Sequence, residues 1–281
     1  MVVVGPGAGR MNTPLFDAFF DDAALFPPGD APMASAVPAH TALRARYGDL
    51  VGPFVVPGAR LEELAALASG PTSFGVSVIA APLDLPDALA RVRAHPVLAL
   101  ASVEVPVVDD ARRAVSELAG IVPDGVPVAV EVPRGPARDE VLDALASASY
   151  RAKVRTGGLV APAFPSPGEL AATLGACVAR GVAFKCTAGL HHAVRHTDPA
   201  TGFTHHGFLN VLVAVDALRA GGTADGWLAE TDASRLVAAV TGWSPERSAA
   251  ARAAFTSFGT CSVTEPIDDL TALGLVEGTR S

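Results

Sequence analysis

Short apolar runs alternate with stretches of helical periodicity along the chain. The first run closes at Pro27-Pro28, and the last contains FTSFGTCSV. Runs that are apolar throughout are typical of strands buried on both faces, and their alternation with helices indicates parallel βαβ units. The pattern predicts eight strands, over residues 18–26, 50–58, 74–82, 98–107, 126–134, 150–158, 182–190 and 255–263.

Amphipathic segments follow these runs and predict the intervening helices. They cover residues 34–47, 59–68, 85–95, 109–120, 137–148, 207–220 and 265–276. A further helix opens at Ser166-Pro167-Gly168-Glu169, a capping box with proline at the first helical position. Residues 224–254 interrupt the alternation of strands and helices, because they predict several helices in succession. One of these begins at Ser244-Pro245-Glu246. We interpret this segment as a helical insertion, or a lid, ahead of the eighth strand.

Eight such units predict the α/β class and a closed (β/α)8 barrel of the TIM type. An open doubly wound sheet is the structural alternative. The length fits a single barrel domain over residues 11–281. Residues 1–10 are expected to form a flexible tail. They have no basic segment before their apolar stretch, so we expect no secretory signal.

Composition narrows the classes of partner. Half of the residues are hydrophobic, which supplies a large core, and the net charge is −8. A nucleic-acid partner is therefore not expected, since phosphate binding relies on a basic face. No apolar run reaches the roughly 18 residues of a membrane span. Cys177, Cys186 and Cys261 form no C-x-x-C pair, which favours a reducing cytoplasm and buried, unreactive thiols.

Only two of the 21 basic residues are lysine, namely Lys153 and Lys185. Arginine cannot replace lysine where a neutral, nucleophilic amine is needed. The two lysines lie in the sixth and seventh runs, so their strands are expected to be neighbours about 4.8 Å apart. Alternation places Arg155 on the face of Lys153, and Thr187 on that of Lys185. A close like charge lowers the pKa of an amine and is a route to Schiff-base chemistry.

Carboxylates end the fourth and fifth runs, at Glu104 and Glu131. Barrel enzymes carry their active sites at the C-terminal ends of the strands, so these glutamates and the two lysines are the candidate catalytic groups. The alternative is a set of salt bridges that plugs the barrel end. Direct contact between a glutamate and the nucleophile would work against activation of the amine. Asp21 and Asp22 either reach the mouth of the barrel or cap a turn.

Three strand ends resemble a known family. KVRTGG (153–158), FKCTAGL (184–190) and FGTCSV (258–263) are similar to the corresponding strand ends of the deoxyribose-phosphate aldolase type of class I aldolase. The resemblance implies that Lys153 forms the Schiff base, that Lys185 perturbs it, and that Glu104 stands where the family has an acidic proton-relay residue, an aspartate. It also implies that the backbone of Gly189 and of Gly259-Thr260 holds a substrate phosphate.

Five of the seven histidines lie within residues 191–206. Three interpretations stay open for this loop. The first interpretation is a zinc or iron site, although the spacing of the histidines matches no strong zinc signature. The second is a polar loop over the mouth. The third interpretation is a substrate-binding loop, with one of its histidines as a general acid or base and Arg195 on an acidic group of the substrate.

The sequence thus predicts a class I aldolase-like lyase that needs no metal or other cofactor and acts on a small carbonyl or acidic substrate. The candidate substrate-binding residues are Arg155, Thr156, Gly157, Thr187, Gly189, His191, His192, Arg195, Gly259 and Thr260. The alternatives are a metal-dependent barrel enzyme that uses the histidine loop, and a non-catalytic barrel that binds a small molecule. A homo-oligomer is compatible with all three of these functions.

Overall fold

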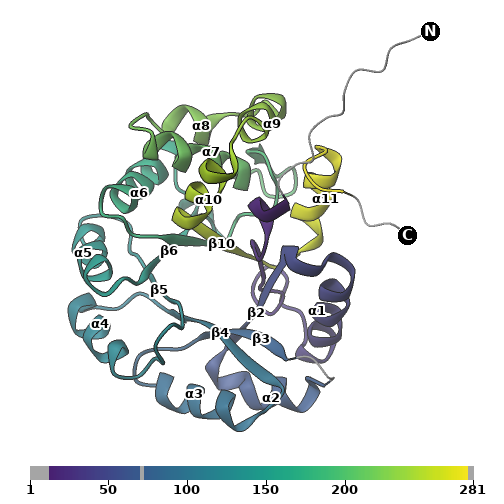
Figure 1. Cartoon of the computed structure of the whole chain (residues 1–281), viewed down its shortest axis with the longest axis vertical. Coiled ribbons are helices and arrows are strands. Elements are labelled where there is room, and N and C mark those ends of the chain that lie inside the picture. Colours follow the sequence, from purple (N-terminus) through teal and green to yellow (C-terminus); the bar gives the residue numbers. More distant parts are fainter. Residues whose placement is uncertain (1–12, 70–72, 278–281) are drawn as a thin grey trace.

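The computed structural model describes residues 13–69 and 73–277. Within these ranges, eight parallel strands close into a barrel with helices around it (Figure 1). The strand order is β1-β10-β7-β6-β5-β4-β3-β2, and β1 (Phe20–Asp22) pairs with β10 (Phe255–Thr260) to complete the ring. The predicted barrel is confirmed, and the alternative of an open sheet is wrong. The expected tail, residues 1–10, lies outside the described residues.

Every barrel strand forms inside one of the predicted apolar runs. The other six are β2 (Val51–Pro57), β3 (Phe74–Ile79), β4 (Leu98–Val105), β5 (Val128–Glu131), β6 (Arg151–Arg155) and β7 (Phe184–Thr187). Most of their residues are buried, because the outward side chains lie under helices and the inward ones fill the barrel.

Aromatic packing supports the closure between β1 and β10. The ring of Phe19 lies 4.9 Å from that of Phe255 and 5.4 Å from that of Phe258, edge-on in both cases. Phe20 contacts Phe258 and Phe208 in the same way. Edge-to-face pairs of this kind stabilise by about 0.5–1.5 kcal/mol beyond the area that they bury. The seam of the barrel is therefore a continuous aromatic cluster.

The helices follow the strands in order. They are α1 (Met33–Tyr47), α2 (Leu61–Leu67), α3 (Leu85–Ala94), α4 (Ala111–Ala119), α5 (Arg138–Ala148), α6 (Pro167–Ala179), α7 (Phe208–Arg219) and α11 (Thr264–Ala272). The predicted capping box is present at α6, where Ser166 and Glu169 bond each other's backbone N–H groups.

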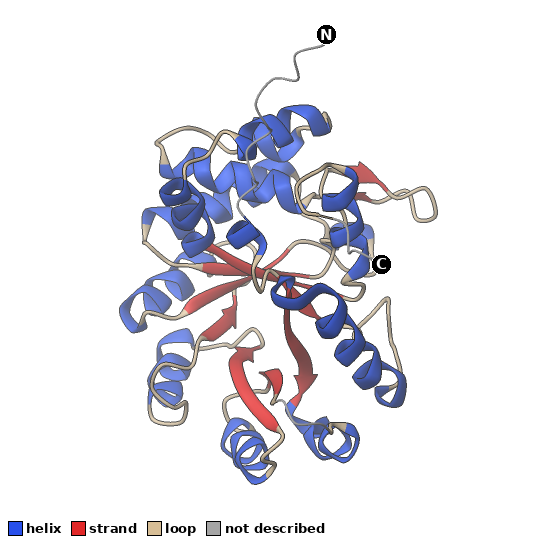
Figure 2. Cartoon of the chain, turned by 45° about the vertical axis from the view of Figure 1, so that its right-hand side comes forward, coloured by secondary structure: helices blue, strands red, loops and turns tan. Residues whose placement is uncertain are grey.

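Two further units lie between β7 and β10. The segment expected to be helical forms α8 (Asp225–Ala229), α9 (Ala233–Thr241) and α10 (Pro245–Ala254), which gather on α7 (Figure 1). The histidine loop contains a small antiparallel hairpin, β8 (His196–Thr197) and β9 (Thr204–His205), that stands apart from the barrel strands (Figure 2). The sequence predicted a loop here and gave no sign of these strands.

Strand register decides which side chains meet inside the barrel. Lys153 on β6 is the Cα partner of Lys185 on β7, and Glu131 on β5 is the Cα partner of Lys153. The two lysines therefore lie at matching heights on neighbouring strands, as predicted. Each is about 4% exposed, so both amines are inside the protein.

Candidate active site

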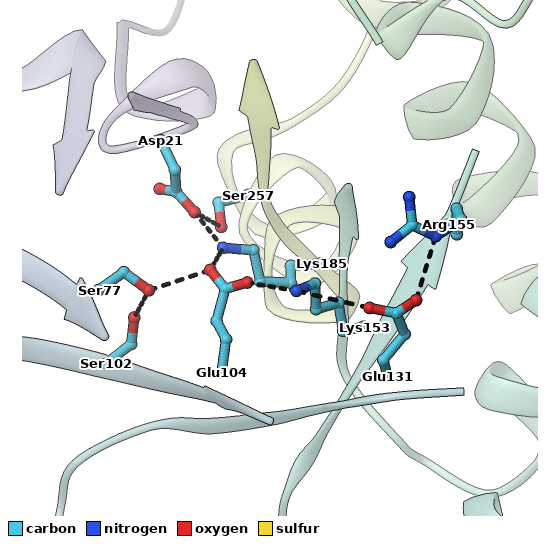
Figure 3. Close-up of polar contacts among 9 residues, drawn as sticks. All are labelled: Asp21, Ser77, Ser102, Glu104, Glu131, Lys153, Arg155, Lys185 and Ser257. Carbon is cyan, nitrogen blue, oxygen red and sulfur yellow. Dashed lines mark hydrogen bonds and ion pairs between the residues drawn. The ribbon is translucent and has the colours of Figure 1, made fainter. Parts of the chain in front are cut away.

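Glu104 joins the two lysines. Its Oε2 lies 2.9 Å from Lys153 Nζ, and its Oε1 accepts a hydrogen bond from Lys185 Nζ. The carboxylate therefore lies between the two amines (Figure 3). The sequence predicted that the lysines would be neighbours, but it could not place a counter-ion between them. The register does so, because Glu104 on β4 reaches across the barrel interior.

Each lysine has a second carboxylate. Lys185 donates to Asp21 Oδ2 at 2.6 Å, and Ser257 donates to the same oxygen at 2.8 Å. Lys153 Nζ lies 3.6 Å from Glu131 Oε2, while Arg155 donates to the other oxygen of Glu131 at 3.1 Å. Both glutamates thus contact Lys153 directly, the arrangement that we expected to work against simple activation by a like charge.

Two serines extend the network on the other side of Glu104. Ser77 donates to Glu104 Oε1 at 3.0 Å, and Ser102 donates to Ser77 Oγ at 2.7 Å (Figure 3). These hydroxyls come from β3 and β4, where the neighbouring positions are apolar. Glu104 is therefore fixed from both sides, and its position depends on the packing of the strands rather than on a loop.

Burial and ion pairing shift the pKa values of the groups in this network in opposite directions. Burial alone would raise the pKa of Glu104, but Lys185 and Lys153 outweigh it, so the pKa lies well below the usual carboxyl range. Burial would lower the pKa of Lys185, yet Asp21 and Glu104 hold it well above its ordinary value. Burial raises the pKa of Asp21, and Lys185 acts against that effect. The network thus favours the ammonium form of Lys185 and the carboxylate form of Glu104.

A cavity of about 530 Å³ opens above the network at the C-terminal ends of the strands. Glu104, Glu131, Lys153 and Lys185 all line it, so both amines border space that a ligand can fill. The volume lies within the range of small-molecule sites. The position is also the one that barrel enzymes use for chemistry.

The loops that follow β6 and β7 are in close backbone contact at the C-terminal end of the barrel. Gly157 follows β6 and Gly189 follows β7, and a Cβ atom added to Gly157 would lie only 2.8 Å from Gly189 Cα. Gly189 has φ +85°, a conformation that residues with side chains rarely adopt. Thr156 hydroxyl donates to the carbonyl of Ala188 and thereby ties the same two loops together. Thr156 and Gly157 shape the site without lining the cavity, whereas Gly189 is one of its lining residues.

The structure divides the predicted substrate-binding residues into two groups. Those that line the cavity are Arg155, Thr187, Gly189, His191 and Gly259. Those not among its lining residues are Thr156, Gly157, His192, Arg195 and Thr260. Arg195 donates to His206 at 3.2 Å, and the Thr260 hydroxyl bonds the backbone of Ser262, so both are used within the protein.

The histidines pair with acids of α11. His191 Nδ1 lies 2.9 Å from Glu265, and His192 Nδ1 lies 3.2 Å from Asp269. The rings of His196 and His205 stack at 5.2 Å across the hairpin. In the described part of the chain, no group of three or more His, Cys, Asp or Glu side chains is placed to hold a metal ion.

Several residues at the site had weak or no sequence signals. Asp21 was one of two adjacent acids, and only the structure separates them: Asp21 faces the network, whereas Asp22 bonds His40 and the Ala24 N–H. Ser257 lies in an apolar run with nothing to mark it. Phe164 and Phe203 line the cavity from loops whose fold the sequence does not indicate.

No protein-family model matches the sequence, and a search of curated proteins finds no significant match. The similarity to class I aldolases therefore rests on the three strand-end motifs. In residues 13–69 and 73–277, no helix is both long enough and apolar enough to cross a membrane. What the fold and site define is a closed α/β barrel with a buried lysine–carboxylate network beneath a small-molecule cavity.

Proposed function

We propose that this protein is a class I aldolase-like lyase in which Lys153 forms a Schiff base with a carbonyl substrate. The observation that carries the proposal is the Lys153–Glu104–Lys185 bridge at the base of the cavity. It brings two buried amines onto one carboxylate. A barrel whose lysines served only to bind anions would have no use for a carboxylate between them.

The surroundings divide the roles of the two lysines. Lys185 is held as an ammonium by Asp21 and Glu104, so it serves as the fixed charge. Lys153 is the proposed nucleophile. Glu104 lies 2.9 Å from its Nζ and Glu131 lies 3.6 Å from it, and Glu131 is the proposed partner in proton exchange. Lys185 also keeps Glu104 from moving away once Lys153 has given up its charge.

The first step forms the covalent intermediate. The neutral amine of Lys153 attacks the carbonyl carbon, an N–C bond forms, and the C=O π pair moves to oxygen. The nitrogen then loses a proton and the oxygen gains one, which gives a carbinolamine. That hydroxyl then leaves as water, and an iminium ion remains. Glu131, whose side chain is 12% exposed at the cavity edge, is placed to accept and return these protons.

The second step breaks the carbon–carbon bond. A base removes the proton of the substrate β-hydroxyl, and the oxygen electrons form the C=O bond of a departing aldehyde. The electrons of the broken C–C bond form the C=C bond of an enamine, while the C=N pair returns to nitrogen. The enamine is protonated at carbon, and water hydrolyses the resulting iminium to free the second carbonyl product. His191 and His205 line the cavity and are the proposed acceptors of the hydroxyl proton.

Borohydride trapping tests the proposal. Wild-type protein is incubated with aldehydes, ketones and keto acids, reduced, and read by intact mass and then by peptide mapping. We expect a single stable adduct on Lys153, because only a Schiff base is converted to a stable amine. Mapping in the wild type avoids reliance on a variant that fails to fold.

Two matched variants complete the test. Lys153→Arg should abolish the adduct, whereas Lys185→Arg, which keeps the positive charge, should retain a weaker one. Circular dichroism and the melting temperature check that each variant is folded. An adduct on Lys185, or none on native protein with any carbonyl, would overturn the assignment and favour a barrel in which the lysines only balance the glutamates.

A further inference from the structure

We propose that the substrate carries a bulky apolar group, of the size of an aromatic ring system, and no phosphate. The statement that the substrate is a carbonyl compound rests on the proposed function. The apolar, phosphate-free character does not, because it follows from the walls of the cavity and from the charges around them.

The upper walls of the cavity are apolar on two opposite sides. The loop after β1 supplies Phe26, Pro27 and Pro28, and β2 and β3 supply Val55 and Ile79. The loop after β6 supplies Leu159 and Phe164. Leu159 is 66% exposed, an apolar side chain at the rim that a bound ligand would cover.

The hairpin adds an aromatic lid to one side. Phe203, in the turn between β8 and β9, packs on Phe164 with ring centroids 5.4 Å apart, and His205 lies 4.5 Å from Phe164. All three line the cavity. A flat apolar group between this cluster and the Phe26 loop would contact rings on both sides, an arrangement that favours aromatic ligands.

Each lysine and arginine of the described cavity lining already contacts a carboxylate. These residues are Lys153, Arg155 and Lys185. Four carboxylates, Asp21, Glu104, Glu131 and Asp198, lie in the network or on the cavity wall against these three cations. A phosphate dianion would enter a site whose formal charge is already negative. Arg155, which bonds Glu131 through Nε, would be left to meet it with its terminal nitrogens alone.

Acidic side chains also lie at the position where barrel enzymes commonly bind phosphate. That place is formed by the loops after the seventh and eighth strands and by a helix N-terminus. Here the first turn of α11 carries Glu265, whose carboxylate meets His191 from the loop after β7 at 2.9 Å. Whether or not His191 is protonated, the pair is neutral or negative. A neighbouring pair, His192 with Asp269, repeats the arrangement.

Ligand binding that needs no covalent step tests the proposal. The probes are 2-naphthylmethanol, which has no carbonyl, and glycerol 3-phosphate. Calorimetry on wild type and on Lys153→Arg should show binding of the naphthyl probe in both proteins and no measurable binding of the phosphate probe. Phe203→Ala should weaken naphthyl binding about tenfold, as expected for loss of one buried aromatic contact. Leu83→Ala is the matched control, since Leu83 is 88% exposed and does not line the cavity.

Turnover then separates this proposal from the proposed function. The aromatic β-hydroxyketone 4-hydroxy-4-(6-methoxy-2-naphthyl)-2-butanone splits by retro-aldol cleavage into acetone and a fluorescent aldehyde, and 2-deoxyribose 5-phosphate is the phosphorylated comparison. We expect cleavage of the first and not of the second. Tighter binding of the phosphate probe, or no effect of Phe203→Ala, overturns the ligand class. Naphthyl binding with no adduct on Lys153 supports the ligand class and overturns the lyase.

Discussion

His206 is a fully buried histidine whose hydrogen bonds fix its protonation. Its Nε2 donates to the carbonyl of Pro165 at 2.8 Å, and its Nδ1 accepts from Arg195 at 3.2 Å. Because a guanidinium can only donate, Nδ1 has no proton. Burial, and then the charge of Arg195, lower the pKa of His206 to about 4 despite its bond to Pro165. The folded protein therefore holds this side chain neutral.

This gives a pH dependence of stability with a definite sign. Between pH about 6.5 and pH about 4, His206 is protonated in the unfolded chain but neutral in the folded chain. The free energy of unfolding therefore falls as the pH falls. The loss reaches roughly 3 kcal/mol at the lower end. Urea unfolding of wild type and His206→Gln across this range should show a flatter curve for the variant. Equal slopes in the two proteins would contradict the prediction.

At the residue scale, the sequence was sufficient where alternation along a strand decides the outcome. Lys153 and Lys185 share the interior because each lies at an inward position of a buried strand, and Glu104 and Glu131 end strands at the same side of the barrel. It was not sufficient for Asp21, whose role depends on which of two adjacent acids faces inward. Nor could it show that Thr260 and Arg195 bond Ser262 and His206 and are not among the cavity-lining residues, because those partners lie in loops without regular spacing.

At the scale of elements, the contact between the loops after β6 and β7 depends on Gly157. A Cβ atom there would lie 2.6 Å from the ring of Phe164 and 2.8 Å from Gly189 Cα. The ring can turn, but the backbone of Gly189 cannot yield without moving the loop. The β6 loop would have to shift away from the cavity.

We therefore expect Gly157→Ala to lower the free energy of unfolding by about 1–3 kcal/mol, as for other overpacked sites. It should also reduce the rate of borohydride labelling at Lys153. Gly75→Ala, where nothing lies within 4 Å of the added atom, is the matched control in a barrel strand. Urea unfolding and timed labelling measure both effects. Wild-type labelling in Gly157→Ala would show that this loop contact does not shape the site.

The elements themselves were largely predictable. Each barrel strand is a continuous apolar run, and the caps at Ser166 and Ser244 mark helix starts that the structure contains. The hairpin within 196–205 was not predictable, because its strands have two residues each and consist of histidine and threonine. Such strands follow from their contacts over the mouth rather than from local preference.

At the scale of the whole molecule, the polar network connects seven of the eight described barrel strands. Asp21 belongs to β1, Ser77 to β3, Glu104 to β4, Glu131 to β5, Lys153 to β6, Lys185 to β7 and Ser257 to β10. Glu104 is its centre, since it contacts both lysines and Ser77. The group that defines the site therefore also holds the barrel interior together.

Removing the charge of Glu104 should consequently destabilise the entire fold. Glu104→Gln keeps the shape but leaves two buried ammonium groups short of a counter-ion, and breaking a buried pair from one side costs about 3–5 kcal/mol. In this variant Lys185 keeps its ion pair with Asp21, and Lys153 keeps only the longer contact to Glu131. We therefore expect the free energy of unfolding, measured in urea, to fall by about 3 kcal/mol.

Glu131→Gln is the matched control, the same change one strand away. Its carboxylate lies at the edge of the network, with Arg155 half in solvent, so its loss should cost about 1 kcal/mol or less. The difference between the two variants measures how far the barrel depends on its centre. If both lose the same small amount, water reaches the lysines and screens them. Glu104 would then serve the chemistry of Lys153 without supporting the fold.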